Sequence, residues 1–218
     1  MAYPTATIVT TDYTAAATSH AVNLPASIGV GDLLLIWFGC NGSPTVTTPS
    51  GWTLKETISI GGDSYRLFSK IASGSEGATV SITISASNSA SALALKCPDC
   101  TAWGSVSGSD STEFMAPDAI TPEAGILRCL SMSLYGISGT RPVTEYELGL
   151  TVVEDAAADG TTSTVTLWVL GENRVTDTAA FPATPAKLGA ATPHAWCTVL
   201  LTGEEITSGG LTLIVIED

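Results

Sequence analysis

Short stretches of this chain alternate strictly between apolar and polar residues. Residues 78–85 read ATVSITIS, with apolar side chains at even positions and hydroxyl side chains at odd positions. A period of two places the two sets on opposite faces of a β-strand, one on a core and one in water. No segment sustains the period of a helix. The pattern therefore predicts an all-β protein with very little helix.

Glycine, proline, asparagine and aspartate interrupt the alternating stretches at intervals typical of antiparallel sandwiches, about 8–12 residues. Hairpin turns are predicted at Gly61-Gly62-Asp63 and Asp159-Gly160. The predicted fold is an antiparallel β-sandwich, jelly-roll-like in its layers. The predicted strands are 5–9, 18–24, 32–40, 52–59, 64–72, 78–85, 91–97, 126–135, 146–153, 164–170, 194–202 and 210–217.

An internal sequence repeat divides the chain into two similar halves. The stretch 31–42 (GDLLLIWFGCNG) aligns with 125–136 (GILRCLSMSLYG) at an offset of 94 residues, and the same offset takes Trp52 to Tyr146. We predict one domain over 1–218 with pseudo-repeat halves at about 20–100 and 115–205. A loop over 100–123 would separate the halves, because residues 105–111 are small and polar. A C-terminal strand at 210–217 would follow.

The net charge of the chain argues against some classes of binding partner. The chain has 218 residues with 21 acidic and 8 basic side chains, and a formal net charge of −13. Phosphates are met by Lys and Arg, so this balance argues against nucleic acid and against an anionic membrane surface. The N-terminal residues have neither the basic nor the apolar region of a signal peptide, so we expect synthesis in a cytoplasm. The apolar content of 44% excludes a disordered chain.

The cysteines do not form a disulfide framework. They are five, an odd number, at irregular spacing: Cys40, Cys97, Cys100, Cys129 and Cys197. Three lie in apolar runs, where a thiol packs as a small hydrophobe. The motif Cys97-Pro98-Asp99-Cys100 lacks a second pair for zinc and a βαβ context for redox work, so it predicts a turn after a strand. We expect all five to be reduced.

No catalytic arrangement can be argued from the sequence. The two histidines, His20 and His194, match no hydrolase motif, and Ser19 beside His20 points to the opposite face of a strand. The acidic residues lie in turns or on strand faces, which disfavours a glycosidase. The segment Asp155–Asp159 could hold calcium, although the EF-hand spacing is absent. We therefore predict no enzyme, no cofactor and no metal site.

Two features point to contacts with other molecules. Of the five tryptophans, Trp103 is the best candidate for an exposed aromatic that touches a ligand, whereas Trp37, Trp168 and Trp196 lie in apolar strands and Trp52 begins one. The C-terminal stretch is apolar on both faces, which predicts that another subunit covers it. The predicted assembly residues are Leu211, Leu213, Ile214, Val215 and Ile216.

A family resemblance rests on three motifs in order: GDLLL at 31–35, PSGWT at 49–53 and a strand from Tyr65 to Lys70 and Ala72. The chain resembles uncharacterised β-sandwich virion proteins of tailed bacteriophages and prophages over about 20–95. The resemblance implies a virion component and carries over no catalytic residue. The acidic charge would repel packaged DNA, which places such a protein on the outside of the capsid or the tail.

The expected function is an outer capsid decoration or cement protein, present as a dimer or trimer and bound to virion proteins such as the major capsid protein. The alternative is a tail fibre, spike or baseplate module that binds host glycans. A third hypothesis is an enzyme such as a glycan hydrolase. Copy number in the particle would separate the first two, because a shell carries hundreds of decoration proteins and a tail carries few.

Overall fold

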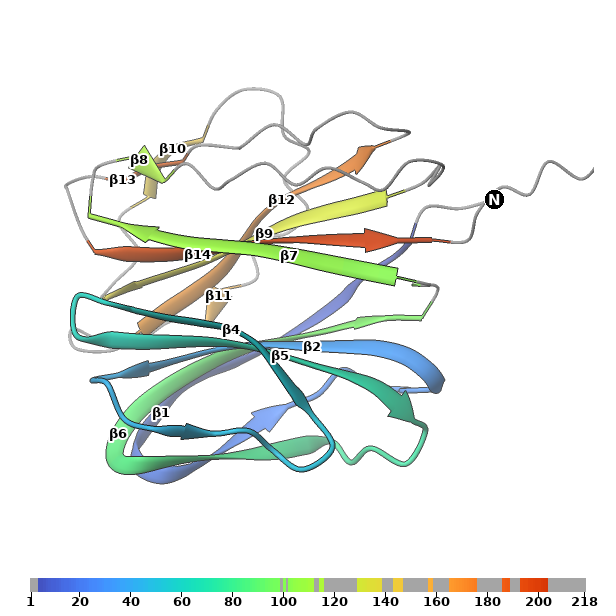
Figure 1. Cartoon of the computed structure of the whole chain (residues 1–218), viewed down its shortest axis with the longest axis horizontal. Coiled ribbons are helices and arrows are strands. Elements are labelled where there is room, and N and C mark those ends of the chain that lie inside the picture. Colours follow the sequence, from blue (N-terminus) through green and yellow to red (C-terminus); the bar gives the residue numbers. More distant parts are fainter. Residues whose placement is uncertain are drawn as a thin grey trace, which may run out of the picture.

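The computed structural model describes residues 4–98, 100, 102–111, 114–115, 129–138, 143–146, 157–158, 165–175, 186–188 and 193–203. Within these residues every regular element is a β-strand, and all strand pairs are antiparallel (Figure 1). A large sheet, sheet A, packs against a second one, sheet B. The predicted all-β sandwich is confirmed. No described residues form a helix that is long and apolar enough to cross a membrane.

Each sheet collects its strands from one half of the chain. Sheet A has the order β1 (Thr7–Asn23), β6 (Thr79–Cys97), β2 (Val30–Asn41), β5 (Asp63–Ser73) and β4 (Thr53–Ile60), and β3 (Val46–Thr47) also pairs with β6. Sheet B has the order β7 (Ala102–Asp110), β14 (His194–Thr202), β9 (Cys129–Ser138), β12 (Val165–Val175) and β11 (Ala157–Ala158). A short sheet C contains β10 (Val143–Tyr146), β13 (Ala186–Leu188) and β8 (Phe114–Met115).

The two large sheets repeat one strand pattern. If the five strands that form the main path of each sheet are numbered along the chain, both sheets have the spatial order first, fifth, second, fourth, third. The pseudo-repeated strand pattern of the prediction is therefore present. The fold is jelly-roll-like in having two packed sheets. Its strand connections differ from those of a jelly roll, because neither sheet takes strands from both halves of the chain.

The most apolar run of the sequence forms β2, which is buried between two hydrophobic cores. Alternate residues of β2, such as Leu35 and Trp37, lie in the inter-sheet core between sheets A and B, together with Met132, Leu134 and Cys197. The intervening residues, such as Ile36 and Phe38, lie in a second cluster, the sheet A core, which is made of residues from the strands of sheet A and from the loops between them. A strand buried on both faces cannot alternate, which is why this segment reads as continuously apolar.

The sheet A core exists because sheet A folds back on itself. The long strands β1 and β6 bend, so that their distal halves form a layer beneath β2 and β5 (Figure 1). The pairing of β1 with β6 shifts register three times between Thr11 and Ser19, and such irregularities allow a strand to bend. Ile82 and Ile84, beyond the bend, pack toward Phe38 and Phe68 in this core.

The loop predicted over 100–123 is wrong in its first part. Residues 102–110 form β7, which pairs with β14 without any shift in register. Its sequence, AWGSVSGSD, is rich in glycine and serine, which are typical of loops. It forms a strand because β14 is wholly buried and offers a continuous row of backbone partners.

The residue pairs expected at the offset of 94 are also wrong. This offset equates Phe38 with Met132, but Phe38 lies in the sheet A core and Met132 in the inter-sheet core. A shift by one residue turns a strand's side chains to the other face, so the equivalence fails. Trp52 precedes β4 of sheet A, whereas Tyr146 ends β10 of sheet C, so these two are not equivalent either.

Candidate functional site

The best-defined polar site in the described residues lies where an edge of sheet A meets an edge of sheet B. We call it the seam, and it comprises Lys55 and Glu56 of β4 with Trp103, Ser105 and Ser107 of β7. Among the strands that the structure describes, β4 pairs with β5 alone and β7 pairs with β14 alone, so both are edge strands of the described sheets. Figure 1 shows them at the near side of the molecule, one above the other.

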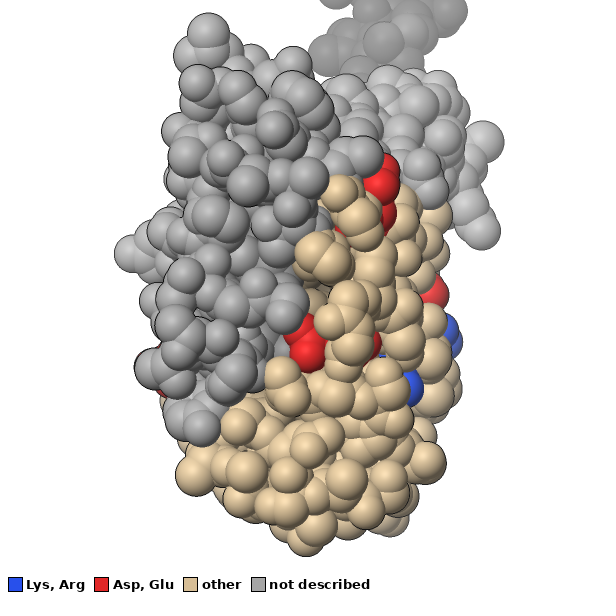
Figure 2. Space-filling view, turned by 90° about the vertical axis from the view of Figure 1, so that its left-hand side faces the viewer, with Lys and Arg blue, Asp and Glu red and all other residues tan. Residues whose placement is uncertain are grey.

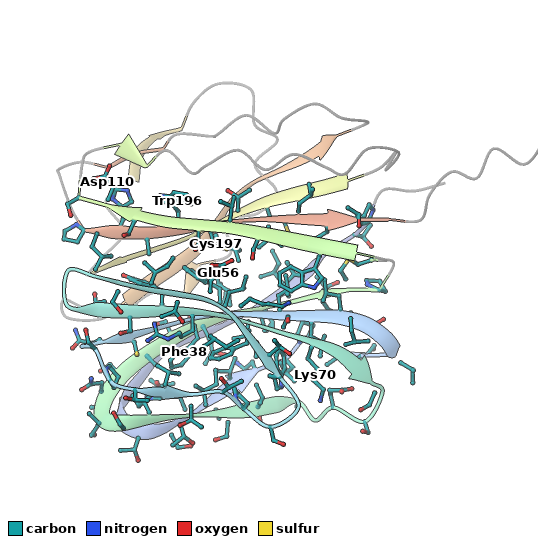
Figure 3. All side chains as sticks on the ribbon, in the orientation of Figure 1. Phe38, Glu56, Lys70, Asp110, Trp196 and Cys197 are labelled. Atoms are coloured by element: carbon teal, nitrogen blue, oxygen red, sulfur yellow. The ribbon has the colours of Figure 1, made fainter. Side chains whose placement is uncertain are left out.

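A bulge in β4 aims a carboxylate between the sheets. Leu54 pairs with Phe68, but the next paired residue on β4 is Glu56, opposite Leu67, so Lys55 is the extra residue. Leu67 belongs to the inter-sheet core, and residues directly opposite one another share a face. The bulge therefore turns Glu56 toward sheet B, as Figure 3 shows, where an uninterrupted strand would have turned Lys55.

Two serine hydroxyls of β7 hold this carboxylate. Ser105 Oγ donates to Glu56 Oε1 at 2.6 Å, and Ser107 Oγ donates to Glu56 Oε2 at 2.8 Å. Ser105 and Ser107 are two residues apart, so they share the face of β7 that looks toward sheet A. Each carboxylate oxygen thus has its own donor, and the two sheets are joined by charge-assisted hydrogen bonds.

The buried neighbour of this carboxylate is a thiol. Cys197 of β14 pairs in register with Ser107 and lies in the inter-sheet core. Burial raises the pKa of Cys197 well above its ordinary value, and the negative charge of Glu56 adds to the rise. The thiol is therefore protonated at neutral pH and is a poor nucleophile or metal ligand.

Trp103, the predicted ligand-contact residue, is engaged within the protein. It is partly buried and packs against the inter-sheet core. The Nζ atom of Lys55 lies 5.1 Å from the centroid of its ring, in the range of a cation–π contact. Sequence reasoning identified Trp103 but missed Lys55 and Glu56, because their roles depend on the bulge and on the pairing of sheet edges.

The remaining predicted residues divide into two groups. The assembly residues 211–216 and the calcium candidates Asp155 and Asp159 lie outside the described residues. Cys40, Cys97, Cys100 and Cys197 are thiols, of which only Cys100 is partly exposed. Burial raises the pKa of the Cys40 thiol to about 12. Of the two smaller effects, the charge of Arg66 lowers this pKa and the charge of Asp63 raises it.

His20 forms a second polar cluster, at the bend of β1, and this cluster is also structural. Its Nε2 donates to the Ala17 carbonyl at 3.1 Å, and its Nδ1 lies 2.6 Å from Thr14 Oγ1. Ser19 instead bonds Ser81 at 2.8 Å, so the adjacent Ser19 and His20 form no catalytic pair, as the sequence indicated. Burial lowers the pKa of His20, and hydrogen bonds with the backbone of Ala17 and Asn88 oppose this shift.

The chemistry available to these sites is limited. In the seam both serines donate to a carboxylate and no histidine lies beside them as a general base, so neither is an activated nucleophile. Across the described ranges, no three His, Cys, Asp or Glu side chains are grouped to hold a metal ion. The face of the molecule in Figure 2 carries few charged side chains among its described residues.

Comparisons with protein-family models, with curated proteins and with solved structures found no match. The functional argument therefore rests on the chain's own residues.

Proposed function

We propose that this protein is a structural component of a bacteriophage particle that binds the outer surface of the shell as a homo-oligomer. The observation that carries the proposal is the use of polar groups at the seam. Glu56, Ser105 and Ser107 satisfy one another across two sheets, and Lys55 covers Trp103. These contacts favour a rigid scaffold over a reactive site.

Other polar side chains of the described region have similar roles. The Glu76 carboxylate accepts hydrogen bonds from the backbone N–H groups of Ser73 and Gly74 and contacts Lys70 Nζ at 3.0 Å. Asp32 Oδ2 accepts from the Gly29 N–H at 2.7 Å in the turn before β2. Carboxylates used to fix turns stabilise a framework and do not create a cleft for a substrate.

Charge supports an external position in the particle. A net charge of −13 on 218 residues would repel packaged DNA. The motifs GDLLL, PSGWT and Tyr65–Ala72, which carry the resemblance to virion proteins, fall in or directly before β2, β4 and β5. Their apolar residues, such as Leu34, Trp52 and Tyr65, are buried in the two cores, so the resemblance concerns the framework.

Counting copies of this chain per particle tests the proposal. Quantitative mass spectrometry of purified virions, with the major capsid protein as internal standard, should give hundreds of copies. A count of a few to a dozen would replace the decoration role with the tail alternative. Absence from virions that carry the intact gene would overturn both.

Binding to the shell supplies a second test. Purified protein should bind particles that lack it, and it should not bind free DNA at the same ionic strength. Retention by DNA and not by shells would exclude the proposed role.

A further inference from the structure

We propose that β7 is the edge at which two copies of this protein pair, so that sheet B continues from one copy into the next. This inference deepens the proposed function by naming the surface used for self-association. It rests on a comparison of β7 with three other edge strands of the described residues, β1, β3 and β4. An edge strand presents unpaired backbone groups, and proteins usually protect such edges against pairing.

The other three edges, those of β1, β3 and β4, are protected. Strand β4 carries the bulge at Lys55, which places an irregularity and a positive charge on the edge. Strand β1 shifts register three times between Thr11 and Ser19. Strand β3 is two residues long, Val46–Thr47. Bulges, edge lysines and short length are the devices by which sheet edges avoid pairing with other chains.

Strand β7 has none of these devices. It has nine residues, contains no proline, and follows β14 in unbroken register from Ala102 to Asp110. Residues 102–109 carry no charge, in a chain whose net charge is −13. Figure 1 shows β7 at the near edge of sheet B, drawn in front of β14.

The strand is also held rigid on the side that faces sheet A. Glu56 binds Ser105 and Ser107, and Trp103 packs against the inter-sheet core beneath Lys55. These contacts fix the direction of β7, and no other described strand pairs with the backbone edge that β14 does not use. An edge ordered in advance loses less conformational entropy when a second strand adds to it.

A second copy of β7 is the partner that suits this edge. Antiparallel pairing about a two-fold axis at Val106 places Gly104 opposite Gly108, Ser105 opposite Ser107 and Trp103 opposite Ser109, and glycine permits close approach of the backbones. The single charge of the strand, Asp110, then lies opposite Ala102 of the other copy. Two copies of an acidic protein thus meet along a segment that is nearly free of like charges.

Sedimentation of the full-length protein over a concentration series tests this pairing. We expect a reversible dimer, and we expect Val106→Lys to raise its dissociation constant about 10-fold or more, because the two lysines face each other at the axis. High salt should partly restore the dimer of this variant by screening. The matched control is Val30→Lys, since Val30 is 82% exposed and lies on β2; it should dimerise like the wild type.

A measurement on the unmodified protein guards against a folding defect in the variant. Hydrogen exchange of the wild type at low and high concentration should show slower exchange of β7 amides in the dimer and unchanged exchange of β4 amides. A monomer at every soluble concentration, a dimer unaffected by Val106→Lys, or β7 amides that do not change would each overturn the inference. None of these results depends on virions, so failure here is distinct from failure of the proposed function.

Discussion

The carboxylate of Glu56 accepts a hydrogen bond from the hydroxyl of Ser105 across the gap between the two sheets, at 2.6 Å. Glu56 also accepts from Ser107 at 2.8 Å, so one side chain of sheet A fixes two positions of β7. The contact depends on the bulge at Lys55, which gives Glu56 its inward direction. A local irregularity in one edge strand thereby sets the position of the edge strand in the other sheet.

Glu56→Ala should lower the free energy of unfolding by about 1–3 kcal/mol, because two serine hydroxyls lose a charged acceptor. Glu56→Gln should cost about half as much, since the amide oxygen still accepts one bond. Urea denaturation followed by tryptophan fluorescence measures both. Asp12→Ala, which removes an exposed carboxylate from β1, is the control and should change stability by less than about 0.5 kcal/mol. Equal effects of Glu56→Ala and Asp12→Ala would contradict the role of the seam.

Gly108→Ala should destabilise the protein by about 1–3 kcal/mol through overpacking. A Cβ atom at Gly108 would overlap the indole of Trp196, which lies opposite in register on β14. Gly77→Ala is the matched control, because nothing lies closer than 3.8 Å to its added Cβ. The double variant Gly108→Ala with Trp196→Leu should recover part of the loss, as a thermal denaturation series would show. Strict additivity of the two changes would argue against this contact.

Glu76 should make stability fall with acid below about pH 4.5. Hydrogen bonding to the Ser73 backbone is the main cause that lowers its pKa to about 2, and the contacts with Lys70 and the Ser73 hydroxyl contribute as well. A carboxyl whose folded pKa is depressed stabilises the protein above its unfolded pKa and loses this contribution as pH falls through the folded value. Glu76→Gln should flatten the decline between about pH 4.5 and 2. An NMR titration that placed the carboxyl near its ordinary pKa would refute this.

His20 should make the stability of the fold decrease as the pH falls below about 6.5. Burial lowers its pKa below the ordinary value of 6.5, so the unfolded chain binds the proton more readily than the folded one. Stability is then complete above about pH 6.5 and decreases as pH falls through the lowered pKa. Imidazole ¹⁵N NMR should place the proton of the neutral ring on Nε2, because Nε2 donates to the Ala17 carbonyl. Thr14→Val should shift the Nδ1 resonance, whereas a neutral ring protonated on Nδ1 would disprove the assignment.

The thiols should differ sharply in reactivity. Cys100 is partly exposed, whereas Cys40, Cys97 and Cys197 are buried, and burial raises the pKa of Cys40 and of Cys197. In the native protein at pH 8, Cys100 should react with an alkylating reagent well before these three. In denaturant without reductant, five thiols per chain should be found. A count of three or one would reveal disulfides and overturn the expectation of a reducing compartment.

The class of fold follows from the sequence alone, because side-chain alternation is a local property of a strand. The pattern at 78–85 predicts a strand with one buried face, and the structure has Ile82 and Ile84 buried. The run at 32–40 predicts a strand, and all nine of its residues are buried. The buried positions of Trp37, Trp52 and Trp196 also follow from local context.

The partners of the strands, and the side chains that these partners bring together, depend on tertiary contacts. Residues 102–110 are a strand because β14 provides backbone partners, although their composition is typical of a loop. Glu56 faces sheet B because of a register shift that no local pattern reveals. The period of two identifies the faces of a strand but not its partner or its register, and one residue of slip exchanges the faces. The fold class is therefore visible in the sequence, whereas the seam depends on contacts between residues about 50 positions apart.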